Sequence, residues 1–542
     1  MSKIYIKEVD LTTVESYAQD VNDVVYIPGF SSIDPQAYGA SKVNVPTLCR
    51  STREFEAAFG SKPALFNANQ AYPSFPSEAI PQTSGVNNYM FLKEDADPSY
   101  IYAKELLARG IPVVYERINS ITDATSASYD VTVSAMYTFL ETRAFSYTAN
   151  IFTTKATEGL TATITNATFT EQFKTSGDYL FTLTTLAASA QDHNIWTVSS
   201  GDFTGTYTED GTGEGTLASI GVEVNRVSGT GVKGDTFTVV LYMEDPAIMD
   251  KSNYNIKYIT TGGYPVFEYK SGKSIANAMA TLAMNRGDCI ALIDHTNNPA
   301  RSLVSSTSVY NHAKDGTYAL AGAIASYAAM FTPWCEYALL NTYNDVALSR
   351  FALPPSFAYL SCLAESLRNN PAWMAIAGAT RGKVLNLYSV DTDYVITNAI
   401  ADSYTPDNAI CVNPITNIRP YGQCIWGNRT LVDNSVKGGT TALSFLNIRN
   451  IVCDIKKQLF VACQSLLFEQ NTDILWMNFI ALMSPTLDRM VSGYGISNYK
   501  IIRVDPSDKT KITAIIRIYP VYAVESFDIT LYLQNGEVEV EE

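Results

Sequence analysis

The chain is 542 residues long, 46% of its residues are hydrophobic, and its formal net charge at pH 7 is −16. This length exceeds what one hydrophobic core usually serves, so we expect two to four domains. Binding to phosphates requires clustered Lys and Arg, which this acidic sequence does not show, so its composition argues against a nucleic-acid partner.

Neither secretion nor membrane insertion is indicated. The N-terminus, MSKIYIKEVD, has no apolar run behind its lysines, and the longest weakly polar run, from Ala319 to Phe331, is too short to span a bilayer. The eight cysteines include no C-x-x-C pair, and several lie in apolar runs. We therefore expect free thiols packed in the cores of a protein made in a reducing compartment.

Residues 1–22 are expected to form an N-terminal arm. In its KIYIK stretch Ile4 and Ile6 alternate with Tyr5, which predicts one short strand with no hairpin partner close behind it. The partner of this strand must come from elsewhere.

Residues 23–119 alternate between strand and helix patterns. The runs VVYIPGF and VPTLC predict strands, and a helix is expected after Ser51, whose S-x-x-E spacing to Glu54 makes a capping box, with Gly60 as its stop. A second helix, SYIYAKELLARG, leads directly into IPVVYERI, an apolar run suited to a buried strand. These patterns indicate the opening of an α/β domain.

Between residues 120 and 245 the composition shifts to Thr, Ser, Gly and Asn, and period-two alternation replaces the helix patterns. Alternate residues of DYLFTLTTL and DTFTVVLYM share a face, which predicts strands. Gly-rich stretches at 211–215 and 229–234 predict hairpin turns. We interpret the segment as an inserted, peripheral β-domain, a small sandwich or barrel.

The α/β pattern resumes at residue 246, with the helix SIANAMATLAMNRG and the strand CIALIDHT. We therefore expect residues 23–119 and 246–407 to form one discontinuous α/β core domain.

A turn-rich loop from Asn413, containing Trp426, is expected to feed a long amphipathic helix and to dock against it. At about 100° per residue, Asn450, Lys457 and Gln464 fall on the outward face. The buried arc should hold Ile448, Ile451, Val452, Ile455, Leu459, Cys463 and Leu466. We assign this helix to a C-terminal α+β domain, residues 408–525.

Residues 526–542 are expected to form a C-terminal arm, in which apolar residues alternate with polar ones before the chain ends in GEVEVEE. The apolar positions are Phe527, Ile529, Leu531 and Leu533. A lone strand gains most by adding to an exposed sheet edge on another molecule, so we predict that both arms are exchanged between subunits. The alternative, that both fold back on their own C-terminal domain, stays open.

No motif predicts chemistry, and we expect no catalytic residue, cofactor or metal. Residues 229–234 spell G-x-G-x-x-G but lie between two strand patterns, without the helix that a phosphate site needs. Residues 272–274 spell G-K-S without the first glycine of a P-loop. We interpret the first as a hairpin turn and the second as a helix N-cap.

The three histidines do not indicate a metal site or a catalytic site either. None of His193, His295 and His312 has a second ligand at metal-binding spacing, and Asp294-His295 lacks a nucleophile motif to complete a triad. Aspartate and histidine after a strand are common turn residues, which is the interpretation we prefer.

Several strings together resemble the contractile tail sheath protein family of myovirus-type bacteriophages and related contractile injection systems. They are N-P-I, G-x-x-x-W-G-N-R-T-L, N-I-R-x-I and F-E-Q-N near the C-terminus, R-G-D-x-x-A-L-I-D after the insertion, and A-A-x-x-x-P-W and P-P-S between them. The resemblance covers nearly everything except the β insertion. The motif residues to which this resemblance assigns a structural role are Pro333, Trp334, Pro354, Pro355, Trp426, Gly427, Arg429 and Thr430.

This resemblance implies a non-enzymatic structural subunit that polymerises as stacked hexameric rings around a tail tube, and that contracts to drive the tube through the host envelope. It implies baseplate and tail terminator proteins as further partners, with no nucleic acid and no membrane insertion, and a place in the virion after synthesis in the bacterial cytoplasm. The family places its C-terminal domain against the tube, so the basic residues Arg449, Lys456 and Lys457 become candidates for that contact.

Three alternatives remain on the sequence alone. The sheath could belong to a phage-derived injection particle instead of a phage. From other classes, the chain could be a cytosolic α/β enzyme with a β insertion, or a β-decorated adhesin, although the latter must explain the α/β core.

Overall fold

The computed structural model of the protein describes a large part of the chain, and the account below concerns those residues. They are 23–29, 44–60, 98–118, 136, 139–140, 143, 147–155, 160–164, 177–186, 194–200, 203–208, 215–217, 222–226, 233–243, 247–263, 275–294, 320, 324–341, 350–390, 398–504 and 512–525.

An eight-stranded sheet forms the body of the molecule, in the order β19-β18-β14-β13-β12-β1-β3-β2. Its six inner strands are parallel, whereas β2 and β19 pair antiparallel at the two edges. The strands are β1 (Val24–Gly29), β2 (Thr47–Cys49), β3 (Val113–Arg117), β12 (Ile256–Ile259), β13 (Ile290–Asp294), β14 (Ala328–Thr332), β18 (Asn413–Ile418) and β19 (Gly422–Ile425). Strands from both sides of the insertion therefore share one sheet, as a discontinuous α/β domain requires.

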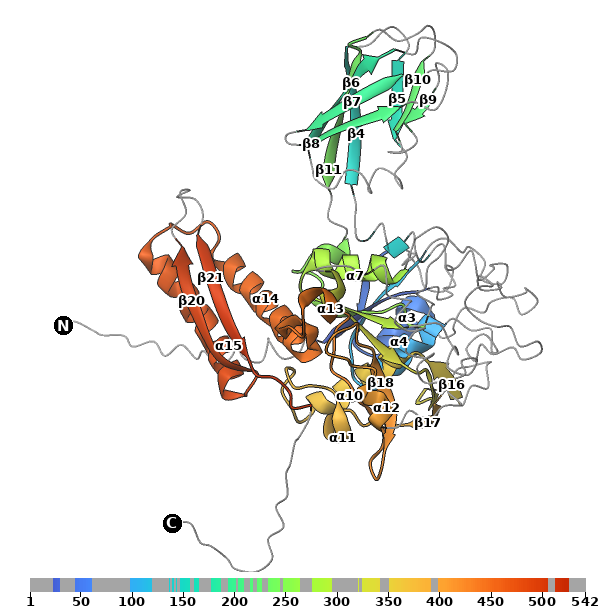
Figure 1. Ribbon diagram of the computed structural model, residues 1–542, viewed down its shortest axis with the longest axis vertical. Coiled ribbons are helices and arrows are strands. Elements are labelled where there is room, and N and C mark those ends of the chain that lie inside the picture. The colour runs from blue at the N-terminus through green and yellow to red at the C-terminus, as the bar shows by residue number, and fades with distance from the viewer. Residues whose placement is uncertain are drawn as a thin grey trace, which may run out of the picture.

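Helices cover both faces of this sheet (Figure 1). One face packs against α3 (Thr52–Phe59), α4 (Pro98–Ala108) and α10 (Pro355–Leu367). The other packs against α7 (Ile275–Arg286) and the 3-10 turn η5 (Ile324–Tyr327). Strands buried on both faces have near-continuous apolar sequences, which is why the runs around β1, β3 and β13 could be recognised.

The N-cap Ser51 and the stop at Gly60 of α3 are confirmed, whereas the second half of the predicted capping box is not formed. The Ser51 side chain accepts from the backbone N–H of Glu54 at 3.2 Å, while the Glu54 carboxylate accepts from the N–H of Arg50 and not from that of Ser51. Gly60 ends the helix with φ of 84°, a conformation that a residue with a Cβ rarely adopts.

Smaller elements complete the body. A three-stranded antiparallel sheet runs β16 (Arg350–Leu353), β15 (Cys335–Ala338), β17 (Leu387–Val390). The remaining short helices are η4 (Ala247–Met249), α11 (Gly378–Arg381), α12 (Asn398–Asp402), α13 (Asn434–Lys437) and η6 (Ala442–Ser444).

The inserted segment forms two antiparallel sheets, drawn at the top of Figure 1. The five-stranded sheet is β4-β11-β6-β7-β8 and the three-stranded sheet is β5-β10-β9. Their strands are β4 (Tyr147–Lys155), β5 (Leu160–Ile164), β6 (Gly177–Thr185), β7 (Ile195–Ser200), β8 (Phe203–Thr208), β9 (Gly215–Leu217), β10 (Val222–Arg226) and β11 (Thr236–Met243). The expected face of β6 is buried, and Phe181 stacks on Phe237 of β11 with ring centroids 4.5 Å apart.

The two predicted Gly-rich hairpins are wrong. Residues 211–215 connect β8 to β9, and residues 229–234 connect β10 to β11, and in each case the two strands belong to different sheets. Glycine marks a change of direction but does not say whether the next strand pairs with the last one, because pairing depends on the rest of the sheet.

The C-terminal part forms a separate layer at the left of Figure 1. Helices α14 (Leu446–Leu466) and α15 (Asp473–Ser492) pack against a two-stranded antiparallel sheet of β20 (Ile496–Val504) and β21 (Thr513–Pro520). We call these four elements the C-terminal unit.

The expected loop at 413–425 is instead the hairpin β18–β19, and β18 extends the core sheet beside β14. Asn, Pro and Gly in this stretch suggested a loop, but Asn413 of β18 contacts Met330 of β14, which is 83 residues away and could not be read locally. The boundary that we expected at residue 407 thus precedes two strands of the core sheet.

Candidate functional site

The string around Trp426 folds into the cap of helix α14. The N-cap residue, Phe445, has no side chain that accepts a hydrogen bond. Asn428 replaces it from a distance: its Oδ1 accepts from the Asn447 backbone N–H at 3.2 Å, its Nδ2 donates to Asn447 Oδ1 at 2.7 Å, and its carbonyl accepts from the N–H of Leu446. The first turn of a helix leaves N–H groups without partners, so this remote side chain stabilises the start of α14.

Asn413 holds the same loop against the core sheet. Its Nδ2 donates to the carbonyl of Met330 in β14 at 3.0 Å and to that of Arg429 at 2.8 Å, while its Oδ1 accepts from the Arg429 N–H at 2.7 Å. A Cβ on Gly427 would lie 2.7 Å from Asn413 Oδ1. The glycine of the string is therefore required by the close approach of the amide.

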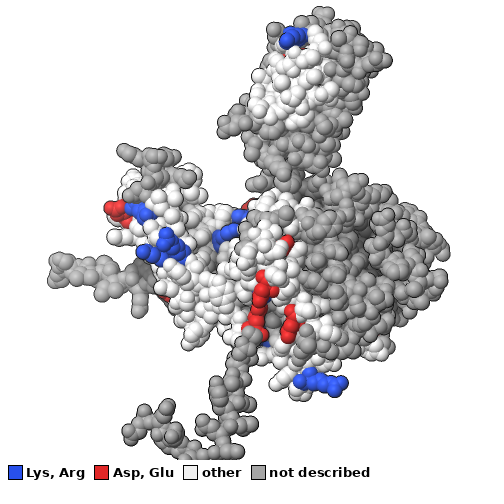
Figure 2. Space-filling view, in the orientation of Figure 1, with Lys and Arg blue, Asp and Glu red and all other residues white. Residues whose placement is uncertain are grey.

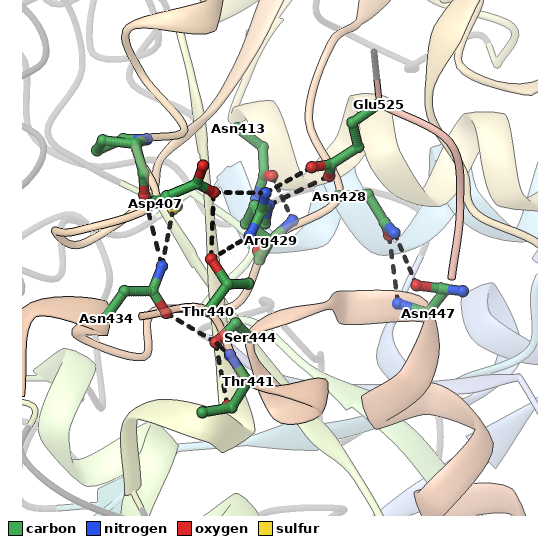
Figure 3. A network of polar contacts seen from close by, with 12 residues as sticks. Asp407, Asn413, Asn428, Arg429, Asn434, Thr440, Thr441, Ser444, Asn447 and Glu525 are labelled. Carbon is green, nitrogen blue, oxygen red and sulfur yellow. Dashed lines mark hydrogen bonds and ion pairs between the residues drawn. The ribbon is translucent and has the colours of Figure 1, made fainter. Parts of the chain in front are cut away.

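Arg429 lies at the centre of the polar network in Figure 3. Its side chain is buried, and its guanidinium forms a two-pronged ion pair with the Glu525 carboxylate, with Nε 3.1 Å from Oε1 and Nη2 against Oε2. Asp407 Oδ1, 3.4 Å from Nη2, and Thr440 Oγ1, 3.5 Å from Nη1, complete its surroundings. The ring of Phe445 stacks beneath it, 4.4 Å from the guanidinium carbon.

Thr430 and the segment after it tie the loop to the short helices. The N–H of Thr430 donates to the Ser444 carbonyl at 2.9 Å, and its hydroxyl donates to the Leu443 carbonyl at 2.7 Å. Ser444 Oγ in turn donates to Asn434 Oδ1 at 2.7 Å. The string is thus one hydrogen-bonded unit that joins the core sheet, α13 and the start of α14.

The other motif positions are structural too. Trp334 is buried in the core beneath α10, and Pro354 and Pro355 are the N-cap and first residue of that helix, where proline's fixed φ fits. Trp426 is only partly buried, and its Nε1 donates to Asp402 Oδ1 at 3.4 Å. Because α10 starts with prolines, its free N–H groups need an acceptor from another element.

Asp294 supplies that acceptor. At the end of β13, its two carboxylate oxygens accept from the Ser356 N–H at 2.8 Å and from the Ser356 hydroxyl at 2.6 Å. The Tyr102 and Ser356 hydroxyls lie 2.9 Å apart. Burial raises the pKa of Asp294 to about 7, although the hydrogen bonds from Ser356 and Thr260 oppose the rise. Asp294 therefore has a structural partner for each oxygen, and His295 lies outside the described residues.

The topological switch point of the sheet lies between β1 and β12, where doubly wound proteins usually bind ligands at the carboxyl ends of the strands. Here side chains fill it. Ser99 of α4 and Tyr115 of β3 share a hydrogen bond of 3.0 Å, and a Cβ on Gly29 would lie 2.0 Å from Tyr115 Oη. A Cβ on Gly262 would lie 2.9 Å from the Ser99 backbone.

The expected outward face of α14 is wrong for its first half. Asn450, Lys457 and Arg449 are all buried, because this half of the helix packs against both the core sheet and the elements α15 and β20. Arg449 donates to the Ser326 carbonyl at 2.9 Å and stacks over the ring of Tyr327. Lys456 is exposed and donates to the Tyr327 hydroxyl at 2.7 Å. Of the three candidates for tube contact, Lys456 alone is exposed in this chain.

Two buried lysines, Lys257 beside α14 and Lys457 on it, have contrasting electrostatic environments. Lys257 of β12 lies 3.1 Å from Asp23 Oδ1 and 3.1 Å from Asp454 Oδ2. Burial lowers the pKa of Lys257, but the two carboxylates outweigh it and raise the pKa above its usual value. Lys457 Nζ has no hydrogen-bond partner among the described residues, and burial lowers its pKa despite the opposing effect of Asp288 and Asp454.

Sequence reasoning missed Lys257, Asp454, Asn413 and Glu525 as partners. A signal existed for Lys257, since it is a charged residue inside the strand run YNIKYIT. Nothing marked Glu525, whose partner Arg429 is 96 residues away.

Several predictions fall outside the described residues. These are the arm positions Ile4, Tyr5, Ile6, Phe527, Ile529, Leu531 and Leu533, the three histidines, and residues 272–274. All eight cysteines are free, and seven are buried as expected, whereas Cys463 is exposed. Within the described ranges there is no group of His, Cys, Asp and Glu that could hold a metal ion, and no helix that is long and apolar enough to cross a membrane.

No protein-family model and no curated protein matches the chain. Among solved structures, the chain is similar to a sheath protein of the extracellular contractile injection system PVC in its contracted state, at 20% identity over 49% of this chain and 69% of that one, with a TM-score of 0.37. A chain of the anti-feeding prophage baseplate matches at 12% identity over 99% of both chains, with a TM-score of 0.46. A sheath tail protein from Desulfitobacterium hafniense matches at 9% identity over 96% of this chain and 100% of that one, with a TM-score of 0.38. Components of contractile systems are thus among the solved structures to which this chain is similar, as the sequence motifs predict.

Proposed function

We propose that the chain is the structural subunit of a contractile tail sheath, which polymerises as stacked hexameric rings around a tail tube and contracts to drive the tube through the host envelope. The observation that carries the proposal is the string from Asn413 to Asn450. Its residues resemble the sheath family, and the family positions Gly427, Arg429 and Thr430 hold one network that joins the core sheet to α14. Tube, baseplate and tail terminator proteins are the partners that this function implies.

The packing at the switch point favours a structural protein over a cytosolic α/β enzyme. A doubly wound enzyme keeps a crevice at this place for its ligand. In this chain Gly29, Ser99 and Tyr115 occupy it with their own atoms, and Asp294 is engaged by α10. The carboxyl edge of the sheet thus serves to fix helices.

Subunits are linked through the terminal arms in this proposal. The sheet of β20 and β21 has two strands in the described residues, so each strand presents an edge to which a further strand could add. Its uncovered face carries Lys500 directly opposite Arg517, and the C-terminal arm ends in the acidic run GEVEVEE. Like charges facing each other across a sheet are unfavourable, and an acidic strand nearby would relieve them.

Electron microscopy of the purified protein tests the proposal. A sheath subunit polymerises into hollow, striated tubes, alone or on tail tubes. Truncation of residues 1–8 or 526–542 should leave a folded monomer that forms no tubes. Tubes of normal length from either truncation would overturn arm exchange, and loss of the fold would show that the arms belong to their own subunit.

The same geometry fits the sheath of a phage-derived injection particle. The two differ in what the tube delivers, and purification of the native particle decides between them by whether it carries a genome-filled head. Lys456 stays a candidate for contact with the tube, which a screened surface charge would suit because the tube must slip past during contraction.

A further inference from the structure

Residues 521–525, which we call the strap, follow β21 and cross from the C-terminal unit to the polar network of Figure 3. At the first end, the N–H of Val521 donates to the Gly495 carbonyl at 3.2 Å. At the other end, Glu525 meets Arg429. The last residue of the strap, Glu525, therefore lies against Arg429 of the body and not beside β21, the strand that precedes it in the chain.

Two side chains of the strap contact a surface formed by Arg429 and Phe445. Glu525 is held by the two-pronged ion pair with Arg429, and the ring of Tyr522 meets the ring of Phe445 edge-on, with centroids 5.2 Å apart. Phe445 also stacks on the Arg429 guanidinium, so one aromatic ring connects both contacts. Arg429 and Phe445 are buried, while Tyr522 is half exposed.

The contact is built so that it can open without damage to the core. No residue of the strap is buried, and Val524 is 69% exposed, so few apolar contacts are lost when the strap leaves. The buried guanidinium keeps polar partners after Glu525 is released, because Asp407 and Thr440 remain within reach of it. Figure 2 shows acidic side chains gathered near the centre of this face of the molecule. Asp407 and Glu525 both approach Arg429 Nη2, and the repulsion between these two carboxylates favours opening.

We propose that Arg429 and Phe445 form a docking surface for residues 521–525 of the same chain, and that this contact sets the starting point and the free length of the C-terminal arm. Opening adds five residues to the arm, which span up to about 17 Å when extended. The consequence for assembly rests on the proposed function, since it concerns the arm that a neighbouring subunit would bind. The docking itself is a property of the single chain.

Hydrogen exchange measured by mass spectrometry on the full-length protein tests the docking. Glu525→Gln removes the charge of the ion pair, and Tyr522→Ala removes the aromatic contact while leaving Arg429 untouched. Glu365→Gln is the matched control, because Glu365 forms an exposed ion pair with Arg368 at 3.1 Å that involves no residue of the strap. We expect exchange in residues 521–525 to become roughly fivefold faster in either strap variant, the factor expected for loss of one partly exposed ion pair or of one aromatic contact. The control should leave it unchanged.

The possible outcomes distinguish the docking surface from the proposed sheath function. Unchanged exchange of the strap in both variants overturns the docking surface, and so does faster exchange that spreads equally through α14 and β18, since that would assign Glu525 a general structural role. In assembly, Glu525→Gln tubes should show an altered spacing of their striations, and an unaltered spacing would overturn the role in setting arm length. Failure of the unmodified protein to form tubes would contradict the sheath function and leave the exchange result standing.

Discussion

The eight-stranded sheet and the two-stranded sheet of the C-terminal unit are built from similar residues but are covered very differently. Every residue of β1 and of β13 is buried, because helices lie on both faces. No residue of β21 is buried, and β20 and β21 place only one face against α14 and α15. Ile515 and Tyr519 stay on the open face, each close to half exposed.

The large sheet is therefore covered and paired within one chain, whereas the small sheet keeps an open face and unpaired edges among the described residues. The large sheet has its apolar faces covered and most of its strands paired on both sides within one chain. A two-stranded sheet is marginal by itself in water, so the small sheet depends on α14 and, under the proposed function, on strands from other subunits. It also depends on the contact between Trp373 of the body and the turn between α15 and β20, which we call the joint. Changes to the joint should therefore be felt first in β20 and β21.

Lys257→Met should have the largest effect, because it removes the cation that pairs with both Asp23 and Asp454 and leaves two carboxylates without their buried partner. We expect a loss of about 3–5 kcal/mol in the free energy of unfolding, measured by urea titration. Lys500→Met, at an exposed position of β20, is the control and should cost less than about 0.5 kcal/mol. Equal effects of the two substitutions would show that the Lys257 cluster does not hold α14 to the sheet.

Trp373→Ala should loosen the joint itself. The Trp373 Nε1 donates to the Gly493 carbonyl at 2.8 Å, and a Cβ on Gly493 would lie 2.3 Å from the indole, so the ring fits closely into the turn between α15 and β20. We expect a loss of about 3 kcal/mol, with faster hydrogen exchange in β20 and β21 than in β1. Trp373→Phe keeps most of the packing and should lose about 1 kcal/mol. Equal acceleration in both sheets would argue against a joint.

Asp294 should make the large sheet sensitive to pH. Its folded pKa, about 7, lies above the unfolded value, so its contribution to stability is complete below about pH 4 and is lost as the pH rises towards 7. At about 1.4 kcal/mol per pKa unit, the loss amounts to a few kcal/mol. Asp294→Asn removes this slope, which urea titrations at pH 4, 5.5 and 7 measure, whereas Asp488→Asn at an exposed site of α15 should keep it. A slope that survives in Asp294→Asn would contradict the assignment.

Lys457→Met contrasts with Lys257→Met, although Lys457 lies only three residues after Asp454, the partner of Lys257 on α14. Because Lys457 is buried without a hydrogen-bond partner in the described residues, replacing its charge by a thioether should leave stability unchanged or raise it by up to about 1 kcal/mol. Lys457→Glu, in contrast, places a carboxylate near Asp288 and Asp454 and should destabilise the fold. The thermal midpoint checks both, and a loss as large as that of Lys257→Met would mean that Lys457 is paired.

Excision of residues 147–243 should have the smallest effect on the body. Tyr147 and Met243 face each other across the β4–β11 pair, so the cut ends are neighbours and a short Gly linker can join them. Arg143, which pairs with the buried Glu116 at 2.6 Å, is retained. We expect a change in core stability below about 1 kcal/mol and unimpaired tube formation; a product that fails to fold or to assemble would show that the insertion is not peripheral.

The sequence by itself determined the elements whose cause is local. Ser51, Glu54 and Gly60 bound α3 by capping and by a positive φ, and the apolar runs of β1, β3 and β13 identify strands buried on both faces, because these signals act within a few residues. The string with Trp426, Gly427 and Arg429 also identified the region that holds the network together. Helical periodicity indicated which side of α14 is apolar, but it could not say how much of the helix is covered.

The tertiary structure alone decided the pairings between distant residues. The strand β18 joins the core sheet through β14, Glu525 meets Arg429, and Asp454 meets Lys257, across separations of 83, 96 and 197 residues. Periodicity predicts that Lys457 is polar and outward, yet the body, α15 and β20 pack around that half of α14, and Lys457 is buried. A one-dimensional pattern records what each residue prefers, whereas burial is set by which elements pack around it, and that depends on contacts that close long loops.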